Sequence, residues 1–130
     1  MLKDPLRLPD DIREAIVAHA ENCAPNECCG LLASDDAGRV RFAYPLTNCQ
    51  PSPLTYTVDP DEHFAALQHA ETRGWTLSGA FHSHPKGPPT PSVIDVQKAL
   101  EPDWVYLIVG DGELRGFRIR DREAVEVELV

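Results

Sequence analysis

Two histidines and an aspartate in one short stretch have the residue types and the spacing of a metal site. His82 and His84 stand two apart on a segment expected to be extended. Side chains on a strand alternate with period two, so both imidazoles should point the same way. A proline-rich loop follows and would return the carboxylate of Asp95 to the pair. Zinc held by three nitrogen and oxygen ligands keeps a fourth position for water, so the stretch predicts a catalytic metal centre.

Such a centre also needs a base, and Glu27 is the candidate. It precedes an apolar run that is expected to be a strand, where its carboxylate could sit beside the bound water. Ser92, three residues before Asp95, would offer a hydroxyl to the same cavity. Simpler interpretations exist: the histidines as polar residues at a strand end, Glu27 as a solvated residue, and Ser92 with Asp95 as a helix cap. The cap and the metal site are compatible with each other.

The order and spacing of these residues resemble the JAMM (MPN+) metalloproteases. The shared pattern is H-x-H, seven residues and S-x-x-D, preceded by a glutamate in E-C-C-G-L-L. The resemblance is greatest to the small bacterial members that act on ubiquitin-like sulfur carriers. RadC-like proteins share the metal-site pattern, but they carry an additional N-terminal helical domain and have no recognisable counterpart of E-C-C-G-L-L.

The resemblance implies a chemistry for each of these residues. It implies one zinc ion per chain, held by His82, His84 and Asp95, with Glu27 as general base and Ser92 as donor to the developing oxyanion. The implied substrate is the amide bond after the C-terminal glycine pair of a ubiquitin-like β-grasp sulfur-carrier protein, in some relatives with release of cysteine. A non-catalytic MPN-type interaction scaffold and a zinc amidase acting on small peptides are the alternatives.

Length and charge narrow the class of protein further. A chain of 130 residues predicts a single domain, residues 1–130, with its own hydrophobic core. The formal net charge of −9 disfavours a nucleic-acid partner, because such proteins usually present a basic surface. The segment 1–5 has no apolar signal region, and no run approaches the length that spans a bilayer. We therefore expect a cytoplasmic protein without a membrane partner.

The four cysteines, Cys23, Cys28, Cys29 and Cys49, are expected to be free thiols. A chain of this size without a signal peptide is not typical of a secreted disulfide scaffold. Cys28 and Cys29 are neighbours on a predicted strand, so their side chains should face opposite ways. Since no C-x-x-C pair is present, we expect both to be buried as small apolar residues.

Hydrophobic periodicity and turn residues predict three helices and about seven strands. The helices are expected at 8–23, from Asp59 to about 73, and at 92–100, the last with Val93, Val96 and Leu100 inward. Capping boxes are expected for Asp11 with Glu14 and for Asp59 with Glu62. The strands are expected at 28–33, 39–46, 54–58, 76–84, 104–109, 113–119 and 124–130.

Helices scattered among strands in this way predict a mixed α/β fold, with a curved, largely antiparallel sheet flanked by helices. The resemblance implies the JAMM/MPN fold, which belongs with the cytidine-deaminase-like folds.

Overall fold

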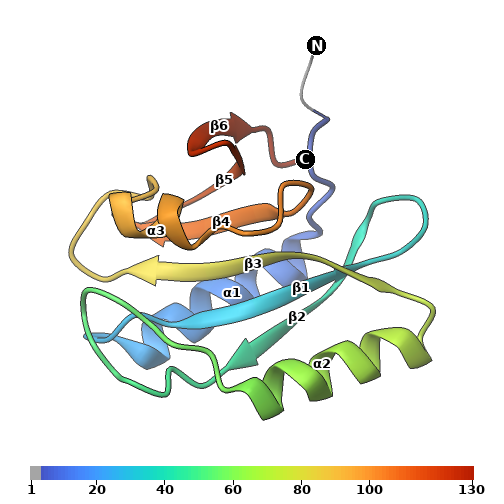
Figure 1. Cartoon of the computed structure of the whole chain (residues 1–130), viewed down its shortest axis with the longest axis horizontal. Coiled ribbons are helices and arrows are strands. Elements are labelled where there is room, and N and C mark those ends of the chain that lie inside the picture. The colour runs from blue at the N-terminus through green and yellow to red at the C-terminus, as the bar shows by residue number, and fades with distance from the viewer. Residues whose placement is uncertain (1–3) are drawn as a thin grey trace.

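The computed structural model describes residues 4–130 and contains three helices and six strands (Figure 1). The sequence predicts no signal region in the segment 1–5. Residues 1–3 of that segment lie outside the described part of the chain. The helices are α1 (Asp10–Cys23), α2 (Pro60–Thr72) and α3 (Val93–Lys98). The strands are β1 (Cys29–Ser34), β2 (Val40–Leu46), β3 (Thr76–His84), β4 (Val105–Gly110), β5 (Glu113–Arg120) and β6 (Glu123–Val127).

All six strands form one sheet in the order β2-β1-β3-β4-β5-β6. Only β3 and β4 run parallel among these neighbours, and every other adjacent pair is antiparallel. Gly79 allows the parallel pair to come close, because a Cβ at this position would collide with the carbonyl oxygen of Val105. The predicted mixed α/β fold with a largely antiparallel sheet is confirmed.

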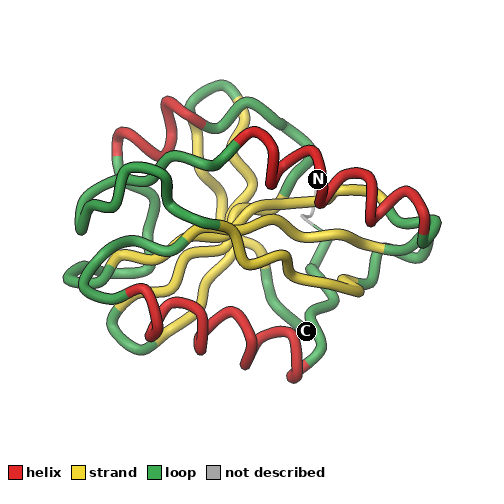
Figure 2. The backbone as a smooth tube through the Cα atoms, turned by 90° about the horizontal axis from the view of Figure 1, so that it is seen from below, coloured by secondary structure: helices red, strands yellow, loops and turns green. Residues whose placement is uncertain are grey.

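Helices cover both faces of the sheet (Figure 2). On one face α1 packs through Ile16 and Ala20, and on the other α2 packs through Ala66 and Ala70. Helix α3 also covers the α2 face, near β4 and β5. Within residues 4–130, no helix combines the length and the apolar character needed to cross a membrane.

The neighbouring cysteines show how the strand alternation builds the two layers of the core. Cys28 belongs to the layer under α1, and Cys29 to the layer under α2, so the predicted opposite orientation is confirmed. Both are fully buried, and burial raises the pKa of each thiol to about 12. All four cysteines are free thiols, as expected.

Helix α2 begins as predicted, although not with a complete capping box. The side chain of Asp59 accepts a hydrogen bond from the backbone N–H of Asp61, and Pro60 occupies the first turn. Glu62 instead accepts hydrogen bonds from the backbone N–H and the hydroxyl of Thr47. Its carboxylate therefore ties the preceding loop to the helix.

The capping box predicted at the start of α1 is wrong. Pro9 is the N-cap residue there, and it makes no side-chain cap. The carboxylate of Asp11 accepts a hydrogen bond from the backbone of Ile12, its own neighbour. Asp10 and Asp11 still place negative charge in the first turn, where the helix dipole favours it.

The strand predicted at 54–58 is also wrong. In this part of the chain only Asn48 and Val58 form an isolated bridge. The side chain of Asn48 accepts from the N–H of Thr57 and donates to the carbonyl of Thr55, so it satisfies backbone groups that a strand partner would otherwise satisfy. Apolar alternation over five residues predicts a strand but does not detect such a competitor.

Helix α3 is shorter than predicted and buries only part of the expected stripe. Val96 packs beneath the helix with Ile108 and Phe117, as predicted. Val93 is 73% exposed and Leu100 is 82% exposed, so their predicted inward orientation is wrong. The helix ends at Lys98, so Leu100 lies beyond it and does not continue the apolar stripe against the sheet.

Candidate metal centre

The histidine pair lies at the end of β3, in the interior of the sheet. His82 and His84 pair in register with Ile108 and Gly110 of β4. Ile108 packs against Val96 of α3, so the histidines face the same helix. Asp95 lies in the first turn of α3 and meets them there.

The three side chains converge on one point. The Nε2 atoms of His82 and His84 are 3.1 Å apart, and Oδ2 of Asp95 is 3.1 Å from the first and 3.0 Å from the second. Ligands at the usual zinc distances in a tetrahedron are separated by roughly 3.3 Å, so this triangle fits one small cation. Across residues 4–130 this is the only group of three or more His, Cys, Asp or Glu side chains that could hold a metal ion.

The local structure of α3 orients the carboxylate. Ser92 is the N-cap, and its hydroxyl accepts the backbone N–H of Asp95 at 3.1 Å. Oδ2 of Asp95 accepts the backbone N–H of Ser92 at 2.9 Å, which completes a capping box. The predicted cap is thus present, and the same carboxylate oxygen faces both histidines.

The electrostatics of the triad favour a positive charge at its centre. Burial alone would raise the pKa of Asp95, but hydrogen bonding to His82 and His84 holds that pKa well below its usual range. The hydrogen bond with Asp95 in turn raises the pKa of His84. A cation bound here would compete with protons for the same three atoms.

Glu27 lies beside this triad, immediately before β1, and the residue is only 4% exposed. Burial raises the pKa of its carboxyl to about 7, against the opposing charges of His84 and Lys98. Glu27, His84 and Ser92 line one open cleft of about 190 Å³, together with Pro53, Leu54, Lys86 and Gly87. All five residues predicted for the site therefore lie near one another.

Sequence reasoning missed the residues that surround this set. The ring centroids of Tyr56 and His82 are 5.0 Å apart. Lys98 donates from Nζ to the carbonyl of Tyr56 at 3.0 Å and to the hydroxyl of Thr55 at 3.3 Å. No motif marks these contacts, because each joins segments that are distant in the sequence.

Two other histidines, His19 and His69, lie outside the site. Nε2 of His19 lies 3.2 Å from the carbonyl oxygen of Leu46. His69 pairs with the hydroxyl of Tyr44 at 2.8 Å and packs in an aromatic cluster with Phe42 and Trp75. Both make packing contacts, and neither belongs to the group that could hold a metal ion.

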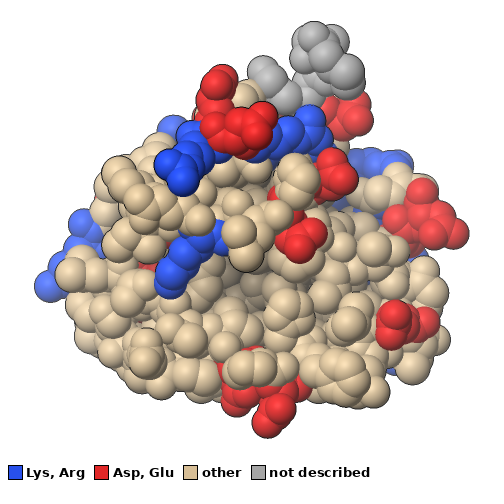
Figure 3. Space-filling view, viewed as in Figure 1, with Lys and Arg blue, Asp and Glu red and all other residues tan. Residues whose placement is uncertain are grey.

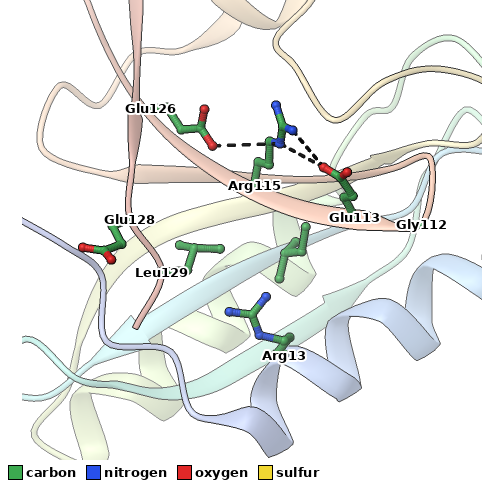
Figure 4. A pocket seen from close by; sticks show the side chains of 8 residues that line it. Arg13, Gly112, Glu113, Arg115, Glu126, Glu128 and Leu129 are labelled. Carbon is green, nitrogen blue, oxygen red and sulfur yellow. Dashed lines mark hydrogen bonds and ion pairs between the residues drawn. The ribbon is translucent and has the colours of Figure 1, made fainter.

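A larger cavity of about 530 Å³ lies beside β5 and the end of the chain after β6 (Figure 4). Arg115 pairs there with Glu113 at 3.0 Å and approaches Glu126 at 3.9 Å. Arg13 of α1 also lines it. Its lining includes none of the three side chains of the ligand group, so its size alone does not make it the candidate site.

Acidic side chains are unevenly distributed over the surface, and few of them lie around His82, His84 and Asp95. On the face in Figure 3, acidic side chains lie along the upper edge, on the right and at the bottom, whereas the surface over α3 shows mainly uncharged and basic side chains. Lys86 lines the cleft, and Lys98 lies on α3. A partner that approaches this cleft would therefore meet little negative charge.

Comparison with known proteins places the chain in a family. The model of the prokaryotic homologs of the JAB domain matches residues 9–123. A desampylase of Haloferax volcanii is 39% identical over 121 residues, which span 88% of this chain and 87% of the relative. A probable TtuB-protein conjugate cleaving protease of Thermus thermophilus is 39% identical over 128 residues, 96% of this chain and 82% of the relative.

Two further matches agree with these. A CysO-cysteine peptidase of Mycobacterium bovis is 34% identical over 122 residues, 89% of this chain and 84% of the relative. A solved structure described as a JAMM metalloprotease-like zinc site in the proteasome and signalosome has a TM-score of 0.61 and 19% identity, and covers 98% of this chain and 99% of that chain. The last match shows the fold. The chain therefore belongs to the JAMM/MPN+ metalloprotease family, among the prokaryotic homologs of the JAB domain.

Proposed function

We propose that this hydrolase uses one zinc ion to cleave the amide bond after the C-terminal glycine pair of a ubiquitin-like or sulfur-carrier protein. The observation that carries the proposal is the convergence of His82, His84 and Asp95 on one point beside the cleft that Glu27 lines. The three side chains would hold the ion and leave a fourth position facing the cleft. We also infer that the chain acts as a single domain, since the described strands form one sheet.

The chain's own residues supply proton transfer and charge stabilisation. When bound, zinc would polarise the scissile carbonyl and lower the pKa of water at the site. Glu27 takes the proton of the attacking water and passes it to the leaving amine. Its raised pKa of about 7 suits this exchange, and a nearby cation shifts the pKa downward.

Ser92 has a free donor for the second role. Its hydroxyl oxygen accepts the N–H of Asp95, so the hydroxyl hydrogen remains available to the cleft. Donation to the oxygen that gains negative charge stabilises the transition state, typically by a factor of roughly 10²–10³ in rate. The cap on α3 fixes the hydroxyl before substrate binds.

The substrate class is supported by what the relatives are named for: cleavage of a protein conjugate and of a CysO-cysteine adduct. The open cleft beside the triad suits an extended tail rather than a folded surface. Exposed Leu54, at the edge of the cleft, offers an apolar contact for the carrier.

An intact-mass assay tests the proposal. Zinc-loaded protein is incubated with a β-grasp carrier whose Gly-Gly tail bears an amide-linked cysteine, and Glu27→Gln with confirmed zinc content serves as the control. We expect loss of the cysteine mass with the wild type alone. Absence of cleavage by zinc-loaded wild type rejects this substrate class, and cleavage by Glu27→Gln rejects Glu27 as the base.

A further inference from the structure

The loop 47–58 between β2 and α2 lies against both Glu27 and the ligand set. It passes beside the start of β1 (Figure 1). We propose that Asn48 in this loop is the positioning residue that fixes Glu27 relative to the metal ligands. The inference rests on the proposed function for the role of Glu27. It adds a residue that neither touches the cleft nor belongs to the metal-site motif.

The side chain of Asn48 uses its full hydrogen-bonding capacity. Nδ2 donates to the carbonyl of Glu27 at 3.2 Å and to that of Thr55 at 3.1 Å. Oδ1 accepts from the N–H of Gln50 at 3.2 Å and from that of Thr57 at 3.0 Å. Two donors and two acceptors are all that a carboxamide offers, so the amide has one well-defined place.

The backbone of Glu27 is held on both sides by this loop. Its carbonyl accepts from Asn48, and its N–H donates to the carbonyl of Ser52 at 2.8 Å. Within residues 4–130 no side chain hydrogen-bonds the Glu27 carboxylate, so the hydrogen bonds that hold this residue are those of its backbone to the loop. A base must stay within hydrogen-bond reach of the proton that it removes, and small displacements reduce the rate.

The same loop also contacts the metal side of the site. Tyr56 packs against the ring of His82, and Lys98 ties Thr55 and Tyr56 to α3. Lys98 lies one helical turn after Asp95. Asn48 joins the two halves, because one amide hydrogen binds the carbonyl of Glu27, just before β1, and the other binds the part of the loop tied to α3.

Two variants separate positioning from general loop stability. Asn48→Asp keeps the shape and both acceptors but loses both donors, and Asn48→Ser loses the donors to Glu27 and Thr55 without adding charge. Thr57→Val is the matched control, because it removes the bond from the Thr57 hydroxyl to Gln50 at 3.1 Å in the same loop without touching Glu27.

Three quantities are measured in each protein: amide hydrogen exchange at Glu27 without metal, zinc content after loading, and kcat and KM on the carrier-cysteine substrate. In both Asn48 variants we expect exchange at Glu27 to quicken at least about tenfold. Zinc content should match the wild type, and kcat should fall about 10- to 100-fold while KM stays within about twofold. Thr57→Val should match the wild type in all three.

Unchanged exchange and kcat in both Asn48 variants would overturn the inference, and so would an equal loss in Thr57→Val. A loss of kcat in Asn48→Asp alone would assign the effect to charge and also contradict it. If the wild type cleaves nothing, the proposed reaction fails, while hydrogen exchange at Glu27 still decides whether Asn48 holds that residue.

Discussion

Nδ1 of His84 lies 2.8 Å from the carbonyl oxygen of Pro88, four residues later in the chain. A carbonyl oxygen only accepts hydrogen bonds, so Nδ1 must carry the hydrogen. In the neutral ring, Nε2 then presents its lone pair to the point where His82 and Asp95 also converge. The proline-rich loop thus sets the tautomer that a metal ligand needs.

Gly110 keeps this loop in place, and replacing it should weaken metal binding without altering a ligand. A Cβ at Gly110 would lie 2.5 Å from the carbonyl oxygen of Gly87 and 2.8 Å from backbone atoms of Pro88 and Pro89. Gly110→Ala must therefore push the Pro88 carbonyl away from His84. Loss of such an outer contact typically lowers metal affinity about 10- to 100-fold. Competition with a zinc chelator measures the change.

Gly116→Ala is the control for general damage to the sheet. Its Cβ would crowd the side chains of Leu107 and Leu129, at 2.9 and 3.0 Å, and these belong to the layer on the α1 face. We expect this variant to lose stability but keep its zinc affinity. Equal affinity in Gly110→Ala and wild type would show that the loop does not tune His84.

Asp95→Asn should remove most of the metal affinity while preserving the fold. The amide oxygen of asparagine can still accept the N–H of Ser92, so the cap of α3 survives. The charge that attracts the cation is lost, and we expect zinc affinity to fall by at least about 100-fold. Full zinc occupancy in Asp95→Asn under chelator competition would remove Asp95 from the ligand set.

The metal ligands could be predicted from the sequence, whereas the contacts that place Glu27 could not. His82, His84 and Asp95 lie in one short stretch, where strand alternation and one helical turn fix their directions. Asn48 reaches Glu27 across 21 positions, and Lys98 reaches Thr55 across 43. Such contacts depend on how the elements pack, and no local periodicity records that packing.

The errors in the fold have the same origin. The apolar alternation at 54–58 is present, but the Asn48 side chain takes the backbone partners there. The apolar residues at 92–100 predict a buried stripe, yet Val93 and Leu100 are exposed. Local pattern predicts the kind of element well, and tertiary contacts decide whether it forms and how much of it is buried.

Substitution of Ser92 should separate its capping role from its catalytic role. Ser92→Ala removes both the acceptor for the Asp95 N–H and the hydroxyl donor, so we expect a loss of about 1 kcal/mol of stability and of about 10²–10³ in kcat. Ser92→Gly lacks the same hydroxyl but is tolerated at an N-cap at a cost of only a few tenths of a kcal/mol.

Thermal unfolding and steady-state kinetics measure the two effects on the zinc-loaded proteins. If the hydroxyl acts in catalysis, both variants lose kcat alike while only Ser92→Ala loses clear stability. A kcat that follows stability, nearly normal in Ser92→Gly and low in Ser92→Ala, would reduce Ser92 to a helix cap.

Glu27 should make the metal-free protein less stable as the pH rises. The folded-state pKa of about 7 lies above the usual value of 4.5, mainly because burial disfavours the charged form. Below pH 4.5 the carboxyl is protonated in both states and contributes no penalty. Between pH 4.5 and 7 the unfolded chain releases the proton first, so the folded state is destabilised progressively, by between about 1 and 3 kcal/mol in total.

Glu27→Gln removes this titration, because the amide carries no charge at any of these pH values. The difference in unfolding free energy between Glu27→Gln and wild type, measured by urea denaturation without metal, should therefore grow in favour of the variant from pH 4.5 to 7 and then level off. Zinc should shrink the difference, because a cation beside the carboxylate favours its charged form. A difference that stays constant from pH 4.5 to 8 would mean that Glu27 is already ionised near its usual pKa, as a solvated residue at a strand start would be.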